Sequence, residues 1–299
     1  MKALKTLGRR VALTTGIVLA STMASSAADI SIGVNMPLTG PFAASGNYVM
    51  NGAKIAVEEI NAAGGVLGSQ LKLIIEDNKS NPTESAAVTE KLISRDKVPV
   101  VLGAWGSTLT LAAMPILQQY KVPMVVETSG ANKITEAGNP YIFRISAEGM
   151  QKQLDFLKVK KADFLAINND WGRSTVADFG KMFKANNVTI GLTEYMDQGS
   201  QDVSAQLAKI KTSDSDTLIV TTAVEQLTLV LKQIKALSLN KQVITTGGSQ
   251  NPDQLIEQAG SAADNSTHLI FFTPWTPDQT AYPDRSKTFI KAWASKGFN

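Results

Sequence analysis

The sequence contains no cysteine and a single histidine, His268. Without cysteine there is no disulfide, no thiolate nucleophile and no Cys-type metal site. A Ser-His-Asp triad would require His268, which opens an apolar run, and we interpret this residue as an ordinary strand-end histidine. The sequence also lacks the G-x-S-x-G, H-E-x-x-H, G-x-G-x-x-G and P-loop patterns. We therefore predict no catalytic residue, no cofactor and no metal site.

An excess of basic charge is also missing once the amino terminus is set aside. Residues 1–28 carry four of the 29 basic residues, then an apolar segment, then small and polar residues. This order is that of a cleaved secretory signal peptide, whose apolar part is too short to span a bilayer. The rest of the chain has 25 basic and 26 acidic residues, which argues against a nucleic-acid partner.

Short apolar runs alternate with amphipathic helical patterns along the remaining chain. Helices that begin near residues 47, 82 and 107 connect the first runs, and the same pattern restarts at residue 162. Strict alternation of this kind predicts parallel sheets covered on both faces. We predict an α/β fold of two doubly wound parallel-sheet lobes with a ligand cleft between them. The predicted strands include residues 30–34, 71–75, 98–102, 123–126, 141–145, 217–220, 242–246 and 268–273, and a last helix covers 286–295.

The segment 98–110 carries the clearest binding signal. A buried strand ends in Gly103-Ala104-Trp105-Gly106, and Ser107 and Thr108 then open a helix. Open α/β sheets bind ligands at the carboxyl ends of their strands. The first N–H groups of a helix and its positive dipole end favour an anion. The segment therefore predicts a site for a negatively charged group near Ser107.

Other candidate residues follow predicted strands in the same way. Trp105 and Trp171 lie in such loops, one in each predicted lobe, where a large ring is either core or pocket wall. The small polar residues of these loops are also common in turns and helix caps, so each of them alone favours a structural interpretation. The candidate ligand-binding residues are Trp105, Ser107, Thr108, Thr128, Ser129, Gly130, Trp171, Glu225 and Gly247.

Several short motifs together resemble one protein family. They include PLTGP at 37–41, GA at 52–53 with IN at 60–61, GGVLG at 64–68, Asp77, Pro82, FR at 143–144 and DWG at 170–172. With them the chain resembles the type I periplasmic substrate-binding proteins of ABC transporters, in the branch named for branched-chain amino acids. The resemblance implies two lobes, residues 29–145 plus 274–299 and residues 146–273. It also implies hinge closure on a small carboxylate-bearing ligand in the periplasm and delivery to a membrane permease.

The resemblance also assigns roles within the candidate site. Ser107 falls where the family binds the ligand carboxylate, Thr128 and Gly130 fall in a second ligand loop, and Trp171 covers the ligand. Gly247 stands where amino-acid binders carry an acid for the ligand ammonium, and Glu225 is the candidate replacement. An organic or aromatic acid without an amino group is therefore an alternative ligand, and a secreted ligand sensor of the same fold is an alternative function.

The resemblance finally bears on the carboxyl terminus. Family members continue past the position of residue 299 with further helices and strands. We therefore expect this chain to be C-terminally truncated and less stable than a full-length member.

Overall fold

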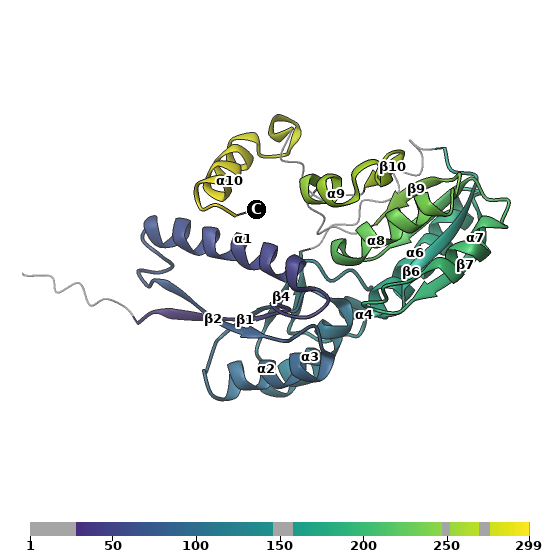
Figure 1. The fold of residues 1–299 in the computed structure, drawn as a ribbon. Helices are drawn as coiled ribbons and strands as arrows, with labels where there is room; N and C mark the ends of the chain where they lie inside the picture. Colours follow the sequence, from purple (N-terminus) through teal and green to yellow (C-terminus); the bar gives the residue numbers. More distant parts are fainter. Residues whose placement is uncertain (1–27, 146–157, 247–251, 269–275, 299) are drawn as a thin grey trace, which may run out of the picture.

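The computed structural model describes residues 28–145, 158–246, 252–268 and 276–298, whose strands form two five-stranded parallel sheets (Figure 1). Helices flank both sheets, so the predicted α/β fold with two parallel-sheet lobes is confirmed. The predicted signal peptide, apart from Ala28, lies outside the described residues. Within these described ranges, no helix is long and apolar enough to cross a membrane.

The first lobe is built on a sheet with the strand order β2-β1-β3-β4-β5. Val34 lies on an interior strand of this sheet and pairs with Ile75 on one side and Leu102 on the other. Parallel pairing brings the carboxyl ends of neighbouring strands to one edge, where the predicted ligand loops begin. The elements are β1 (Ile30–Met36), α1 (Ala43–Ala62), β2 (Leu71–Asp77), α2 (Pro82–Ser94), β3 (Val101–Gly103), α3 (Ser107–Tyr120), β4 (Met124–Val126), α4 (Lys133–Glu136) and β5 (Ile142–Arg144).

The second lobe has the strand order β10-β9-β8-β6-β7. Leu165 and Val220, which pair at the middle of the sheet, are both fully buried. The elements are β6 (Lys161–Ile167), α6 (Asp170–Ala185), β7 (Thr189–Met196), α7 (Ser204–Lys211), β8 (Thr217–Thr221), α8 (Val224–Ala236), β9 (Gln242–Thr245), α9 (Pro252–Ala259), the 3-10 helix η1 (Gly260–Ala262) and β10 (Ser266–His268).

The last helix, α10 (Pro283–Ser295), follows the 3-10 helix η2 (Pro277–Gln279) and lies beside α1 (Figure 1). The ring centroids of Tyr48 and Trp293 are 6.4 Å apart, and Lys296 forms an ion pair with Glu58. The predicted lobe boundaries, 29–145 plus 274–299 and 146–273, stay a prediction. Both junctions, 146–157 and 269–275, fall outside the described residues.

The starts of α2 and α1 differ in how well the neighbouring residues predict them. Helix α2 begins as predicted, because Asn81 accepts hydrogen bonds from the next turn, including one of 2.8 Å from the Thr83 N–H. Helix α1 begins at Ala43, earlier than the predicted start near residue 47. The N–H of Ser45 in its first turn donates to Glu225 of the second lobe at 3.0 Å. This partner is far away in sequence, so the local pattern could not reveal it.

Strand β3 is also shorter than the predicted run at 98–102, since it covers Val101–Gly103. The Val98 N–H donates to the Leu92 carbonyl at 3.2 Å, and the Val98 side chain is buried in the core beside Leu92. The apolar character of this residue therefore serves helix packing and not strand pairing. Of the predicted strand at 268–273, the described part contains only His268, the end of β10.

The second lobe contains a buried ion pair away from the predicted ligand loops. Asp163 and Lys241 have side chains 0% and 5% exposed and lie 3.4 Å apart. The Asp163 carboxylate also accepts hydrogen bonds from Ser213 at 2.9 Å, from the Leu192 N–H at 2.7 Å, and from Ser215. The Lys241 ammonium donates to the Ser215 carbonyl at 2.6 Å. The pair is well supplied with partners, as a buried charge requires.

Candidate ligand-binding site

An apolar cluster joins the two lobes at the predicted site. Trp105 is 8% exposed and packs against Phe42, with ring centroids 4.9 Å apart. The same cluster contains Ile167 and Ala223 from the second lobe, and Trp171 packs against it. Of the two predicted roles for Trp105, the structure supports core, and that core lies at the junction between the lobes.

Ser107 lies at the first position of α3, directly after the N-cap residue Gly106. It is 2% exposed, and its hydroxyl oxygen accepts a hydrogen bond of 3.1 Å from the Ala131 N–H. Because this bond uses the oxygen as an acceptor, the hydroxyl proton stays available to donate to an anion. The first N–H groups of α3 also lack partners within the helix. The geometry at Ser107 is therefore suited to a carboxylate.

The loop after β4 is fastened to the loop before α3. The hydroxyls of Thr128 and Ser129 both donate to the Trp105 carbonyl, at 3.2 and 2.6 Å. Ser129 also shares a hydrogen bond of 2.8 Å with Thr110. These hydroxyls hold the two loops together, so the structural interpretation of Ser129 is the one that the contacts favour. Thr128, which is only partly buried, keeps part of its surface outside this network.

The start of α6 brings the second lobe onto these loops. Trp171 lies against Gly130, since a Cβ atom added to that glycine would be 3.6 Å from the Trp171 Cδ1. The Asp170 N–H donates to the Thr108 hydroxyl at 3.2 Å, and the Asp170 carboxylate forms an ion pair with Lys133. Gly130 and Thr108 are thus in contact with the second lobe, as expected if the lobes close at this edge.

Glu225, at the start of α8, makes a second connection between the lobes. Its carboxylate accepts hydrogen bonds from the Ser45 N–H at 3.0 Å and from the Ser45 hydroxyl at 3.3 Å. Burial raises the pKa of this carboxyl, although the hydrogen bonds from α1 oppose the shift. The carboxylate therefore caps α1 across the lobe junction. Both oxygens of Glu225 therefore accept hydrogen bonds from Ser45. The family resemblance had made the same carboxylate the candidate partner of a ligand ammonium.

Glu127, the residue after β4, is a site feature that the sequence analysis did not select. Its carboxyl accepts hydrogen bonds from the Trp105 N–H and, at 3.4 Å, from the Thr128 hydroxyl. The Oε2 atom is shielded from solvent and has no partner among the described residues. Burial raises the pKa of Glu127 to about 7. The available signal was its position after a predicted strand, which it shares with the selected residues.

The structure thus brings together eight of the nine predicted residues at the lobe junction. Gly247 lies outside the described residues. Asn35, a polar residue at another strand end, is fully buried in a structural network, where it donates to Thr89 at 2.8 Å. Within the described ranges, no three His, Cys, Asp or Glu side chains are grouped so that they could hold a metal ion.

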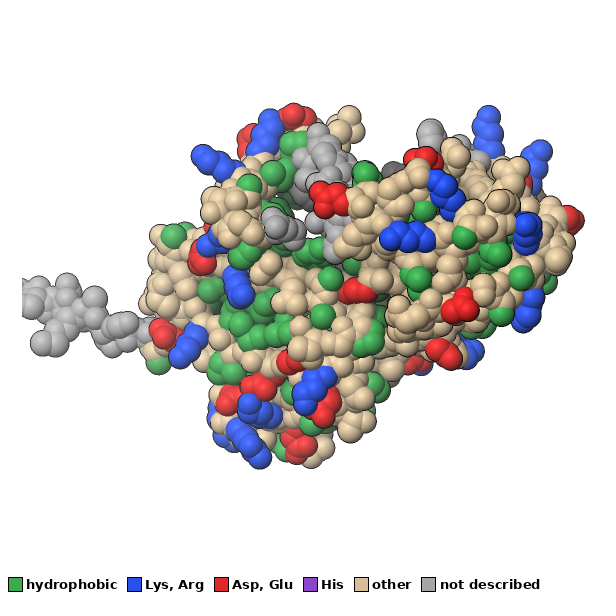
Figure 2. All heavy atoms as spheres, in the orientation of Figure 1, with side chains coloured by type: hydrophobic (Ala, Val, Ile, Leu, Met, Phe, Trp, Pro, Cys, Tyr) green, Lys and Arg blue, Asp and Glu red, His purple; other side chains and the backbone are tan. Residues whose placement is uncertain are grey.

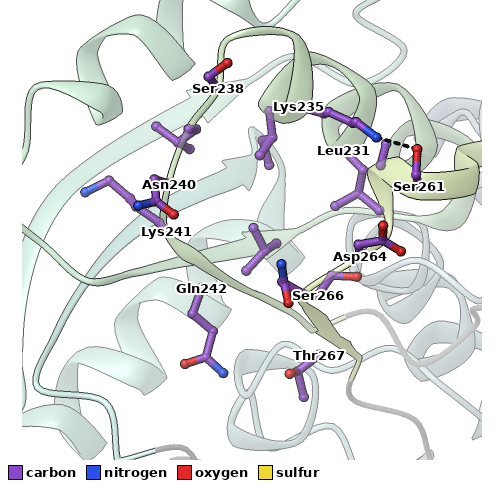
Figure 3. A pocket seen from close by; sticks show the side chains of 15 residues that line it. Leu231, Lys235, Ser238, Asn240, Lys241, Gln242, Ser261, Asp264, Ser266 and Thr267 are labelled. Carbon is purple, nitrogen blue, oxygen red and sulfur yellow. Dashed lines mark hydrogen bonds between the residues drawn. The ribbon is translucent and has the colours of Figure 1, made fainter.

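A hollow of about 890 Å³ opens elsewhere in the second lobe, between the end of α8, η1 and the amino ends of β9 and β10 (Figure 3). Lys235 and Ser261 form a hydrogen bond at its rim. No predicted site residue lines this hollow. Because open α/β sheets bind ligands at the carboxyl ends of strands, we do not assign the ligand to it.

The charge pattern of the surface fits the sequence analysis. On the face shown in Figure 2, Lys and Arg side chains are interspersed with Asp and Glu, and the basic residues do not merge into one broad patch there. Recognition of a nucleic-acid backbone depends on such a patch. This face therefore gives no support to a nucleic-acid partner.

Comparison with known proteins agrees with the geometry. The family model described as periplasmic binding protein matches residues 29–297. The chain belongs to the periplasmic binding protein family. The Leu/Ile/Val-binding protein BraC3 of Rhizobium johnstonii is 30% identical over 276 residues, which cover 90% of this chain and 73% of that protein. This likeness identifies the branch of the family as that of branched-chain amino acids, in agreement with the resemblance found in the sequence.

Solved structures of other binding proteins are similar as well. The substrate-binding protein LivJ of Streptococcus pneumoniae, in complex with isoleucine, has a TM-score of 0.78 and 28% identity, covering 90% of this chain and 77% of LivJ. A solute-binding protein of Rhodopseudomonas palustris in complex with 3,4-dihydroxybenzoic acid has a TM-score of 0.76 and 25% identity. The match covers 90% of this chain and 74% of the R. palustris protein. As a periplasmic binding protein, the chain belongs to a family of solute-binding proteins and not of enzymes, as the sequence predicted.

Proposed function

We propose that this chain captures a small carboxylate-bearing solute between its two lobes in the periplasm and delivers it to an ABC importer. The observation that carries the proposal is Ser107, a buried hydroxyl at the start of α3 with its proton available. A helix start and a hydroxyl together favour a carboxylate. The solutes bound to LivJ and to the R. palustris protein, isoleucine and 3,4-dihydroxybenzoic acid, both carry that group.

The lobes close over the ligand in this proposal. The first lobe offers Ser107 and the loop from Thr128 to Gly130, and the second lobe contributes Trp171 and Glu225. The contacts of Trp171 with Gly130 and of Glu225 with Ser45 support it, because both cross the lobe junction. A ligand that touches both lobes stabilises the closed arrangement and shifts the population toward it. Trp105 is part of the packed floor of this junction.

An amino acid of the branched-chain class is the first candidate ligand, because BraC3 is named as a Leu/Ile/Val-binding protein. An aromatic acid is the second candidate, and two observations favour it. By the family resemblance Gly247 stands where amino-acid binders carry an acid, and the R. palustris protein holds 3,4-dihydroxybenzoic acid. Both candidates share the carboxylate, so both require the proposed site at Ser107.

A thermal-shift screen tests the proposed function. The panel contains the L-amino acids, their 2-oxo and deaminated analogues, and hydroxylated benzoic acids, each as the sodium salt, with uncharged amides as controls. We expect at least one carboxylate to raise the melting temperature in a concentration-dependent manner, because a ligand bound to the folded state adds stability. The matching amide should have no effect. If no carboxylate of the panel raises the melting temperature, the proposed function is wrong.

A further inference from the structure

The Glu127 carboxyl is the buried acid at the lobe junction that the proposed function leaves unused. Its Oε2 atom is shielded from solvent and unpartnered within the described ranges. A buried carboxylate oxygen is costly unless it accepts a hydrogen bond. No described Lys or Arg forms an ion pair with Glu127. The arrangement around Glu127 therefore lacks a donor that a ligand can provide.

The position of Glu127 relative to Ser107 fits an α-amino acid. The carboxyl of Glu127 accepts the N–H of Trp105, and Ser107 follows two residues later at the start of α3. A second hydrogen bond joins the same two loops. The Ala131 N–H, in the loop that follows Glu127, donates to the Ser107 hydroxyl oxygen at 3.1 Å. The two side chains thus belong to the same pair of fastened loops. A ligand whose carboxylate and ammonium are one carbon apart requires partners on adjoining loops such as these.

Glu225 is less suited to an ammonium. Both of its oxygens accept hydrogen bonds from Ser45 of α1, at 3.0 and 3.3 Å. Glu127 has one oxygen with partners and one without. The nearby cation of the described part, Arg144, is bonded to the Ser129 and Ala131 carbonyls and to Thr135. Its guanidinium therefore does not replace the missing donor.

We propose that Glu127 binds the ammonium group of the ligand and so makes the site specific for α-amino acids over acids that lack the amino group. This inference rests on the proposed function, since it requires a ligand carboxylate at Ser107. It assigns to the first lobe the acid that the resemblance places at Gly247.

Isothermal titration calorimetry of the full chain tests this inference with two series of probes. One series contains the L-amino acids and the other contains the same carbon skeletons with the amino group removed, for example L-leucine and 4-methylpentanoate. In the wild-type chain we expect the best amino acid to bind at least about 100-fold more tightly than its deaminated analogue. In Glu127→Gln its affinity should fall by about 10- to 100-fold, which is the effect of losing one charged hydrogen-bond partner. Affinity for the deaminated analogue should stay within a few-fold, and Glu136→Gln, an exposed acid of α4, is the matched control.

Proton release provides a second measurement, which is made first on the wild-type chain. The pKa of Glu127 is about 7 in the ligand-free chain, so an ammonium that binds it at pH 6.5 displaces about 0.8 proton. Titrations in buffers of different ionisation enthalpy measure this number. We expect release with the amino acid and none with the deaminated analogue. The release should persist in Glu225→Gln, which distinguishes the two acids.

Each outcome separates this inference from the proposed function. If Glu127→Gln keeps the full preference for amino acids, or if Glu225→Gln loses it instead, Glu127 is not the ammonium partner and the proposed function stands. If only acids without an amino group bind, the inference is wrong and carboxylate binding still stands. If neither series binds, the proposed function fails, and the inference fails with it.

Discussion

Replacement of Glu225 by alanine tests whether closure depends on the contact between α8 and α1. The Glu225 carboxylate accepts the Ser45 N–H at 3.0 Å and the Ser45 hydroxyl at 3.3 Å. Alanine removes both acceptors and leaves the N–H of Ser45, a buried residue, without its partner across the junction. An unsatisfied buried donor costs about 1–3 kcal/mol. The closed state should lose stability by this amount, which corresponds to about a 5- to 150-fold loss of ligand affinity if the free chain is mostly open.

Glutamine at the same position should have a much smaller effect. Its side-chain carbonyl can still accept the Ser45 N–H, and it removes a charge whose burial is unfavourable. The raised pKa of Glu225 shows this cost, since burial favours the protonated form. We therefore expect Glu225→Gln to bind within about five-fold of the wild-type chain, a difference of about 1 kcal/mol.

Calorimetry with the best ligand of the screen measures the ligand affinity. Small-angle scattering of the ligand-free chain measures its radius of gyration, which reports how far the lobes are open. If the free chain is mostly open, Glu225→Ala should show the loss as weaker binding, and if the free chain is mostly closed, the loss should appear as a larger radius of gyration without ligand. The exposed Glu59 of α1 provides the control variant Glu59→Ala, which should change neither value. Unchanged affinity and radius in Glu225→Ala would refute the reasoning, because the contact would then contribute nothing to closure.

Two further predictions concern stability. Asp163→Asn should lower the free energy of unfolding, measured in urea, by about 3–5 kcal/mol, because it leaves the buried ammonium of Lys241 without its counter-charge. Adding Lys241→Met should restore most of this loss. A loss below about 1 kcal/mol in Asp163→Asn would contradict the role of the pair. Burial raises the pKa of Glu127 from its ordinary value of 4.5, which holds in the unfolded chain, to about 7 in the folded chain. Its contribution to stability is therefore present below pH 4.5 and is lost as pH rises to 7. Relative to Glu127→Gln, the wild-type chain should therefore lose up to about 3 kcal/mol across this window, and parallel stability curves for the two proteins would show that the pKa is not raised.

The fold could be predicted to a large extent because its signals are local. Apolar runs of strand length, the cap at Asn81 and the restart of the pattern near residue 162 each depend on neighbouring residues. The edge that carries the site also follows from the pattern, since parallel strands share one carboxyl edge. Ser107, Thr128 and Trp171 each follow a predicted strand, so this rule is enough to predict that they lie at one edge.

The features that the sequence does not predict depend on contacts between segments that are far apart in the chain. Glu127 follows a predicted strand, but its burial and its hydrogen bond from the Trp105 N–H are properties of the folded chain that its position in the sequence does not reveal. The first turn of α1 is bonded to Glu225 of the other lobe, a partner that is distant in sequence. Asn169 shows the opposite case, since this polar residue at a strand end caps α6 through the Gly172 N–H at 3.0 Å. Sequence alone could not separate such caps from ligand contacts.

The central claim is that Ser107 holds the carboxylate of the bound solute. Titration calorimetry of Ser107→Ala with the best ligand of the screen tests it most directly, and Ser204→Ala, which changes the first residue of α7 on the outer side of the second lobe (Figure 1), is the matched control. We predict that Ser107→Ala loses about 10- to 100-fold in affinity, the effect of one hydrogen bond to a charged group, and that Ser204→Ala binds as the wild-type chain does. An affinity of Ser107→Ala equal to that of the wild-type chain for every ligand found would contradict the claim.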